Sequence, residues 1–162
     1  MKLAILVLED EPDVRAALER DLEPLARTVR IEPAQDVADA REVVAQIEAE
    51  GDVLALVLAD HRLPGTTGVD FLCELAADPD TAYIATVLVT GQADQADTIK
   101  AVNLAGLDYY IAKPWSVAEL DAVVRKLLTD VVEATGLDPM PHLAALDPVR
   151  AMDLVRRRLG DR

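Results

Sequence analysis

The sequence predicts an α/β fold, in which a five-stranded parallel sheet is covered by helices on both faces. One observation is a pair of uninterrupted apolar runs, Leu3–Leu8 and Leu54–Ala59, since such runs are typical of strands buried on both sides. The other is a fivefold alternation of strand-like segments with segments of helical periodicity. Because the crossovers in such folds are right-handed, we expect a doubly wound sheet with the strand order 2-1-3-4-5.

The predicted elements follow from periodicity and from residues that start or stop them. The second strand is short and mixed in character, as expected at a sheet edge. Asp36 and Ser116 are suited to begin helices, and Pro24 and Gly51 to end them. The predicted strands are residues 3–8, 28–32, 54–59, 86–90 and 109–112, and the predicted helices are about 12–23, 37–50, 69–77, 94–105 and 117–131.

Length and charge divide the 162 residues into an acidic body, residues 1–134, and a C-terminal tail, residues 135–162. The whole chain carries a formal charge of -14, and the tail contains five arginines against four aspartates. So acidic a body repels nucleic acid, which argues against direct nucleic-acid binding by it. The hydrophobic content of 51% argues against disorder.

The tail itself predicts a short basic amphipathic helix that begins at Asp147-Pro148. Its apolar residues fall on one stripe, surrounded by arginines: Val149, Met152, Val155 and Leu159. Three interpretations are open at this point: a helix packed on the body, an arm for dimerisation or partner binding, or a linker from a longer protein.

Nothing in the sequence indicates export or a membrane. The apolar stretch Leu3–Leu8 is too short for a signal sequence or a membrane span. The only cysteine, Cys73, excludes an intramolecular disulfide and lies in an apolar helical pattern, as a small core residue does. We therefore expect a cytoplasmic protein without a membrane partner.

Three carboxylates follow the two strands that the predicted order makes neighbours. Glu9 and Asp10 come after the first strand, and Asp60 comes after the third. Open α/β sheets keep their ligands at the carboxyl ends of the strands, so these side chains are expected to meet there. Clustered carboxylates repel one another unless a cation binds, and Mg²⁺ prefers such oxygen ligands.

Two further strand ends carry groups suited to a phosphoryl group. Thr90, at the end of the fourth strand, offers a hydroxyl, and Lys113, after the fifth, offers a positive charge. Phosphoryl transfer to a carboxylate needs mainly positioning and neutralisation of the phosphoryl oxygens. We therefore expect Asp60 to be a phosphoacceptor.

Together these residues resemble the receiver domain of two-component response regulators, a flavodoxin-like fold. The resemblance covers roughly residues 3–130, about four-fifths of the chain, and places its motifs at four strand ends in the right order. The matching segments are Glu9-Asp10, Asp60 with Leu63-Pro64-Gly65 and Gly68, Thr90-Gly91, and Tyr110-Ile111-Ala112-Lys113-Pro114.

The resemblance implies that Asp60 takes a phosphoryl group from a phosphohistidine on a sensor histidine kinase or a histidine phosphotransfer protein. It implies that Mg²⁺ binds directly to Asp10, Asp60 and the main-chain carbonyl of Arg62, and to Glu9 through water. Thr90 and Lys113 would hold the acyl phosphate, and Tyr110 would turn inward as an aromatic switch when Thr90 moves. Such a domain is a signalling phosphoacceptor rather than an enzyme, with at most slow self-catalysed phosphorylation and dephosphorylation.

Several positions depart from the commonest receiver pattern. Glu9 replaces the more usual aspartate, and Trp115 stands where phenylalanine is more familiar. Arg62 and Gln92 flank the path of the attacking water, so we expect them to tune the lifetime of the phosphate. The residues Gly68-Val69-Asp70-Phe71-Leu72, together with the later motifs, are most similar to receivers of regulators related to hydrogenase control.

The resemblance also implies an output surface formed by the fourth helix, fifth strand and fifth helix, and a homodimer through that surface is one candidate for the output.

Three other functions are compatible with an α/β fold of this kind. A phosphohydrolase of the haloacid dehalogenase kind needs a second aspartate two residues after the first, where this chain has Arg62. A flavin-binding protein needs a phosphate-cradling loop after the first strand, but the acidic turn Glu9–Glu11 would repel phosphate. A phosphorylation-independent dimerisation or interaction module of receiver-like fold is the third, and the intact Thr90 and Lys113 argue against it.

Overall fold

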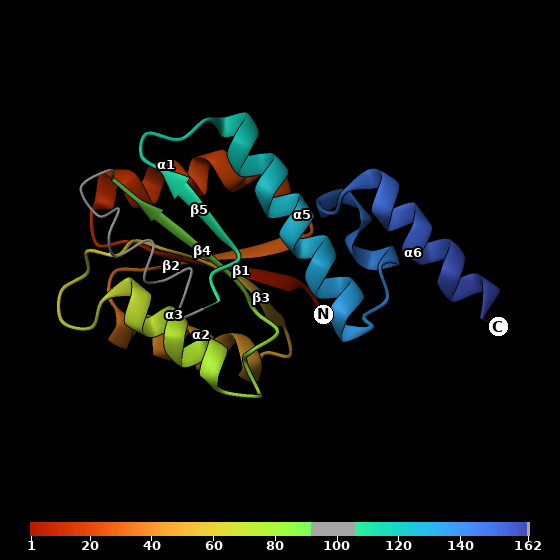
Figure 1. The fold of residues 1–162 in the computed structure, drawn as a ribbon, viewed down its shortest axis with the longest axis horizontal. Helices are drawn as coiled ribbons and strands as arrows, with labels where there is room; N and C mark the ends of the chain where they lie inside the picture. The colour runs from red at the N-terminus through yellow and green to blue at the C-terminus, as the bar shows by residue number, and fades with distance from the viewer. Residues whose placement is uncertain (92–105, 162) are drawn as a thin grey trace.

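The computed structural model describes residues 1–91 and 106–161, and at its centre lies a five-stranded sheet in the order β2-β1-β3-β4-β5 (Figure 1). Every pairing between neighbouring strands is parallel. The predicted fold class and strand order are therefore confirmed. The strands are β1 (Leu3–Leu8), β2 (Val29–Ala34), β3 (Val53–Ala59), β4 (Ala85–Thr90) and β5 (Tyr109–Ala112).

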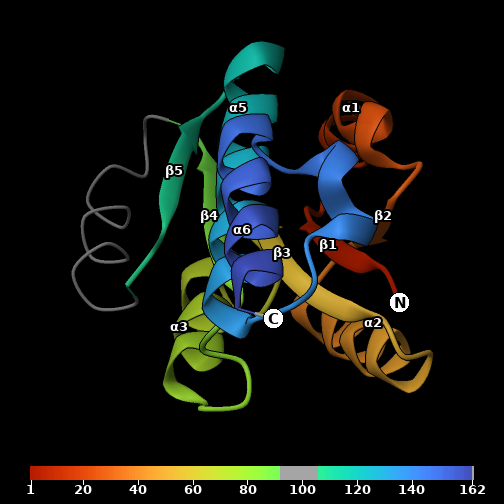
Figure 2. The ribbon, with the colours of Figure 1, turned by 90° about the vertical axis from the view of Figure 1, so that its right-hand side faces the viewer.

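Helices cover both faces of this sheet, as Figures 1 and 2 show. On one face, α1 (Pro12–Leu22) and α5 (Val117–Thr135) bury their apolar sides in one core cluster. On the other, α2 (Val37–Ala49) and α3 (Gly68–Ala77) form a second cluster. A short 3-10 turn, η1 (Glu23–Leu25), follows α1. The helix predicted over residues 94–105 lies outside the described residues.

The second strand is an edge strand, as predicted, but it begins and ends later than expected. It covers Val29–Ala34 because its register with β1 continues as far as the pair Leu8 and Ala34. This extension takes in Pro33, which lacks a backbone N–H and is tolerated only where a strand has a free edge.

The predicted helix starts are confirmed by side-chain caps. Asp36 accepts a hydrogen bond from the backbone N–H of Asp39 at 2.7 Å, and Ser116 accepts one from that of Glu119 at 3.3 Å. A third cap, Thr67 at the start of α3, was not predicted. The caps fix where each helix leaves its loop.

The tail packs on the C-terminal half of α5. After Gly136, whose φ of 70° ends α5, the chain forms η4 (Met140–Ala145) and α6 (Pro148–Gly160). The hydroxyl of the buried Thr129 accepts a hydrogen bond from the backbone N–H of Asp147 at 2.9 Å. Leu146, fully buried, belongs to the same core cluster as α1 and α5. Of the three interpretations of the tail, packing on the body is the one seen.

The apolar stripe predicted on α6 does not make this contact. Val149 is 82% exposed and Leu159 62% exposed, whereas Ala151 and Leu154 pack toward α5. Polar contacts lie on the same side, among them those of Arg150 with Asp130 at 2.7 Å and Glu133 at 2.9 Å.

The carboxyl ends of the strands and the two chain termini lie at opposite ends of the described fold. The strands point their carboxyl ends toward the left of Figure 1, whereas both chain termini lie toward the right. None of the helices in the described part of the chain has the length and apolar composition needed to cross a bilayer.

Candidate functional site

The three carboxylates predicted to meet do so at the carboxyl ends of β1 and β3. Glu9, Asp10 and Asp60 each offer an oxygen within 4.8 Å of the other two. Backbone hydrogen bonds of 3.0 Å hold the two strand ends in register, from Asp60 N–H to the Leu8 carbonyl and from Glu9 N–H to the Ala34 carbonyl. Glu9 is fully buried and Asp60 is 5% exposed, while Asp10 lies at the surface.

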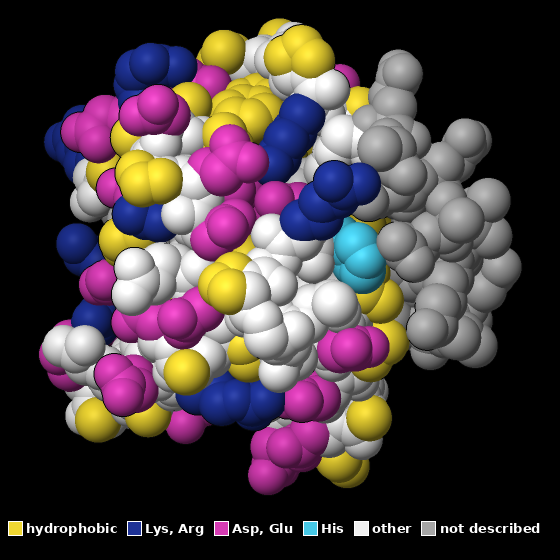
Figure 3. Space-filling model, turned by 90° about the vertical axis from the view of Figure 1, so that its left-hand side faces the viewer, with side chains coloured by type: hydrophobic (Ala, Val, Ile, Leu, Met, Phe, Trp, Pro, Cys, Tyr) yellow, Lys and Arg dark blue, Asp and Glu magenta, His cyan; other side chains and the backbone are white. Residues whose placement is uncertain are grey.

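The ammonium group of Lys113 lies between two of these carboxylates. Its Nζ is 3.0 Å from Glu9 Oε2 and 3.2 Å from Asp60 Oδ2. The backbone places it there, because the N–H of Lys113 donates to the Thr90 carbonyl at 3.0 Å where β4 and β5 end. In Figure 3, which views this end of the molecule, basic and acidic side chains lie side by side.

Burial and charge act in opposite directions on this pair. Burial raises the pKa of Glu9 to about 7, opposed by the hydrogen bond from Lys113 and reinforced by the charge of Asp60. For Lys113, burial alone would lower the pKa. The hydrogen bond to Glu9 and the negative charge of Asp60 outweigh burial, so the pKa of Lys113 lies above its usual value.

Arg15 also contacts the acidic turn, from the first turns of α1. Its Nη1 donates to the main-chain carbonyl of Glu9 at 2.8 Å and lies 3.5 Å from that of Asp10. Arg15 is not among the site residues predicted from the sequence. A signal was present, since an arginine five residues after Asp10 at the start of a helix can fold back over the preceding turn.

Thr90 and Tyr110 lie on neighbouring strands close to this cluster. Thr90 is fully buried at the end of β4, and the register pairs it with Ala112. Tyr110 is half-buried and packs against the core on the α2 and α3 side. The structure therefore places both residues where they were expected along the strands.

The loop after Asp60 approaches the site closely. Gly68 packs so tightly that a Cβ there would overlap the main-chain carbonyl of Asp60. Leu63 is buried under the loop, and Arg62 is exposed. Gln92, the other residue expected to tune the phosphate lifetime, lies outside the described residues.

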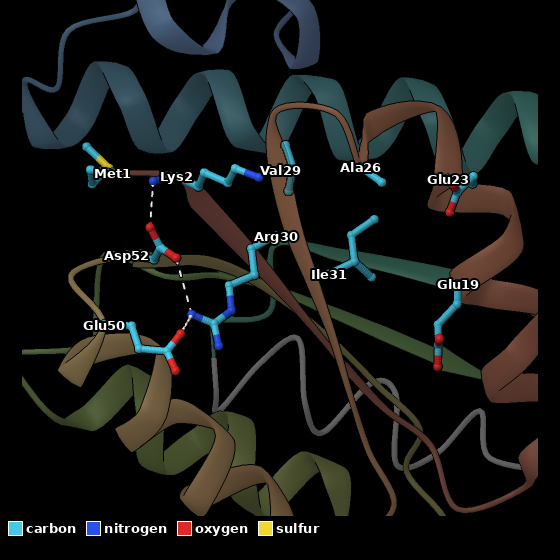
Figure 4. A pocket seen from close by; sticks show the side chains of 10 residues that line it. All are labelled: Met1, Lys2, Glu19, Glu23, Ala26, Val29, Arg30, Ile31, Glu50 and Asp52. Carbon is cyan, nitrogen blue, oxygen red and sulfur yellow. Dashed lines mark hydrogen bonds and ion pairs between the residues drawn. The ribbon is translucent and has the colours of Figure 1, made fainter.

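A cavity of about 640 Å³ lies at the opposite end of the sheet, near the first residues of β1 and β2 (Figure 4). Arg30 bonds there to Glu50 at 2.6 Å and to Asp52 at 3.2 Å. The backbone N–H of Lys2 donates to Asp52 at 2.7 Å. Arg30, Glu50 and Asp52 are thus engaged with one another in this cavity, far from the carboxylate cluster.

Comparison with known proteins agrees with this geometry. The sequence model of the response regulator receiver domain matches residues 5–125, three-quarters of the chain. The chain belongs to the response regulator receiver family. A receiver of this family is a signalling domain of two-component systems, and the match spans the carboxylate cluster, Thr90 and Lys113.

Two curated relatives of this receiver are transcriptional regulators. The chain is 32% identical over 155 residues to the hydrogenase transcriptional regulatory protein HoxA of Cupriavidus necator, covering 95% of this chain and 29% of that one. It is 31% identical over 152 residues to the phosphate regulon transcriptional regulatory protein PhoB of Escherichia coli, covering 88% and 63%. The receiver thus spans less than two thirds of either relative.

A solved structure shows the same fold. The signal receiver domain of an HD domain-containing protein from Pseudomonas fluorescens superposes with a TM-score of 0.72 at 23% identity, over 82% of this chain and 99% of that one.

The donor set of this receiver fits a hard divalent cation. Three carboxylate oxygens within 4.8 Å of one another are typical ligands for Mg²⁺, which keeps several of its waters and needs few protein groups. In their present arrangement, two of the three share the positive charge of Lys113.

Proposed function

We propose that this receiver is a phosphorylation-dependent switch whose phosphoacceptor is Asp60. The observation that carries the proposal is the meeting of Asp60 with Asp10, Glu9 and Lys113 at one strand-end site. A carboxylate in that position has both an acidic site for a cation and a lysine for the incoming phosphoryl oxygens.

In the proposed reaction, Asp60 Oδ forms a bond to phosphorus while the phosphorus–nitrogen bond of a phosphohistidine breaks. The donor is a sensor histidine kinase or a histidine phosphotransfer protein, and the released imidazole takes up a proton. Mg²⁺, held by Asp10, Asp60 and the Arg62 carbonyl, and by Glu9 through water, would neutralise charge on the phosphoryl oxygens.

The remaining side chains would then respond to the negative charge of the phosphoryl group. Lys113 exchanges its contact with Glu9 for one with the phosphoryl group, and the Thr90 hydroxyl donates to it. Movement of Thr90 opens space for Tyr110 to turn inward, which alters the surface around β5 and α5. Arg62 and Gln92 would set how readily water reaches the acyl phosphate.

The output of the switch is a change in protein contacts in the cytoplasm. A homodimer through β5, α5 and the segment between β4 and β5 is one such contact. The two relatives named above are transcriptional regulators. By analogy we expect this receiver to act in regulation without binding nucleic acid or membrane itself, since its body is strongly acidic.

The test is intact mass after incubation with acetyl phosphate and Mg²⁺. We expect an adduct of about 80 Da, one phosphoryl group, in the wild type and in Asp70→Asn, a control that removes an exposed acid of α3. Asp60→Asn should show none. If the wild type gains no mass and binds no Mg²⁺, the alternative of a phosphorylation-independent interaction module takes precedence.

A further inference from the structure

The side chain of Arg15 contacts the main-chain carbonyls of the acidic turn rather than the carboxylates of that turn. Its guanidinium donates to the Glu9 carbonyl at 2.8 Å, with the Asp10 carbonyl at 3.5 Å. We propose that Arg15 is a positioning residue, which holds the Glu9-Asp10 turn so that the Asp10 carboxylate faces Asp60. This inference rests on the proposed function, because it concerns the affinity of the same cation site.

The carbonyl of Glu9 needs such a donor. It lies just past the end of β1, while the neighbouring strand contacts are made by other groups: the Leu8 carbonyl accepts from Asp60 N–H, and Glu9 N–H donates to Ala34. Glu9 itself is fully buried. A buried carbonyl without a donor is costly, and a bond from a charged guanidinium is stronger than a neutral one.

The direction of the Asp10 side chain depends on this turn. Within the described residues, the Asp10 carboxylate takes part in no hydrogen bond or ion pair, and the residue is exposed. With no such contact on the carboxylate, the backbone of the turn sets the direction in which the Asp10 side chain leaves the chain. Side-chain contacts that restrain that backbone are the guanidinium of Arg15 on the Glu9 carbonyl and the N–H of Glu11 on Glu9 Oε1 at 3.2 Å. They add to the strand-end bond from Glu9 N–H to the Ala34 carbonyl.

Removal of Arg15 should change the cation affinity in opposite directions, depending on whether its charge or its positioning of the turn dominates. A guanidinium beside a cation site repels the cation, so its removal alone should tighten cation binding. If Arg15 instead holds the turn, its removal lets Asp10 rotate away and weakens binding. Loss of a side chain that orients metal ligands typically weakens metal affinity by about 10- to 100-fold.

The experiment is a titration of the unphosphorylated full chain with Mn²⁺, a spectroscopic substitute for Mg²⁺, followed by electron paramagnetic resonance. The variants are Arg15→Gln, Arg15→Lys and Arg20→Gln. Arg20 is the matched control, because it lies on the same helix with a side chain 75% exposed. Among the described residues, the hydrogen-bond and ion-pair partner of that side chain is the adjacent Asp21 alone. Thermal unfolding of each variant checks that it is folded.

We expect Arg15→Gln to raise the dissociation constant about 10-fold and Arg20→Gln to leave it unchanged. Arg15→Lys keeps the charge but not the reach, so it should also weaken binding, and it decides the matter if Arg15→Gln does not fold. Unchanged or tighter binding by the folded Arg15 variants would overturn the inference while leaving the proposed function intact. A wild type that binds no Mn²⁺ would contradict the site itself and the inference with it.

Discussion

At the scale of single residues, Glu9 combines full burial with a place in a carboxylate cluster. Lys113 compensates part of the cost, at 3.0 Å from Glu9 and 3.2 Å from Asp60. The extra methylene of glutamate over aspartate gives this side chain reach toward the lysine. In the absence of a bound metal ion, the ammonium group of Lys113 thus compensates the charge of two buried carboxylates.

The raised pKa of Glu9 makes stability depend on pH. Between its usual value of 4.5 and about 7, the folded chain holds a proton that the unfolded chain has released. The free energy of unfolding should therefore fall as the pH rises through this interval and level off above it. We expect Glu9→Gln to lack this fall, which is on the order of 2 kcal/mol.

Urea unfolding at pH 5 and pH 8 with a chelator present measures the effect. Glu42→Gln, which removes an exposed acid of α2, serves as the control and should keep the slope of the wild type. An equal pH dependence in Glu9→Gln and the wild type would show that Glu9 titrates normally in the folded state.

Gly68 makes a second residue-scale prediction, because it has no room for a side chain. Gly68→Ala would force a Cβ against the Asp60 carbonyl. We expect a loss of roughly 1–3 kcal/mol in the free energy of unfolding, together with slower phosphorylation by acetyl phosphate. Gly160→Ala, where nothing lies within 4 Å, should be neutral or slightly stabilising. Equal stabilities for the two variants would contradict this account.

Much of the carboxylate cluster could be predicted because strand ends converge at one edge of a parallel sheet. Glu9, Asp10 and Asp60 needed only the strand order to be brought together. The contacts of Arg15 and Gly68 could not be predicted in the same way. They depend on the path of two loops, and no periodicity in the sequence reports how closely a loop approaches its neighbour.

At the scale of elements, the strands and helices in the described part of the chain followed their hydrophobic patterns, and the orientation of α6 did not. The pattern correctly predicted a helix starting at Pro148, but its most apolar stripe faces solvent. The side that docks on α5 combines the small apolar Ala151 and Leu154 with polar contacts to Thr129 and Glu133. Amphipathicity predicts that a helix has two faces, whereas the contacts with a neighbour decide which face it uses.

Removal of the Thr129 hydroxyl, which holds the start of α6, should therefore lower the free energy of unfolding measurably. Its hydroxyl accepts from Asp147 N–H at 2.9 Å and donates to the Arg125 carbonyl at 2.7 Å. Thr129→Val keeps the shape but leaves that N–H without its acceptor, so we expect a loss of about 1–3 kcal/mol in urea unfolding. Thr135→Val removes a hydroxyl bonded only to the Val131 carbonyl within the described residues, and should cost less. Equal costs would indicate that the Asp147 contact is not stabilising.

At the scale of the whole molecule, the two core clusters are separated by the sheet, and the tail extends only one of them. Ala145, Leu146 and Ala151 join the cluster formed with α1 and α5. The tail thus contributes buried apolar area to the same core that supports β1 and β3. We expect one cooperative unfolding transition that includes both.

Two leucines of the tail test this expectation. Leu146 is fully buried and Leu159 is 62% exposed. Leu146→Ala should lower the free energy of unfolding by about 2–5 kcal/mol, whereas Leu159→Ala should change it by less than about 0.5 kcal/mol. Far-ultraviolet circular dichroism and the fluorescence of Trp115 should report the same midpoint for Leu146→Ala. Separate midpoints would mean that the tail unfolds on its own.

The placement of both chain termini opposite the carboxylate cluster has a practical consequence (Figure 1). A fluorescent protein, an affinity tag or a surface linker joined to either end would project away from Asp60. Such fusions should leave the acidic cluster open, so the chain is suited to immobilisation on a sensor chip for testing whether a histidine kinase binds to it.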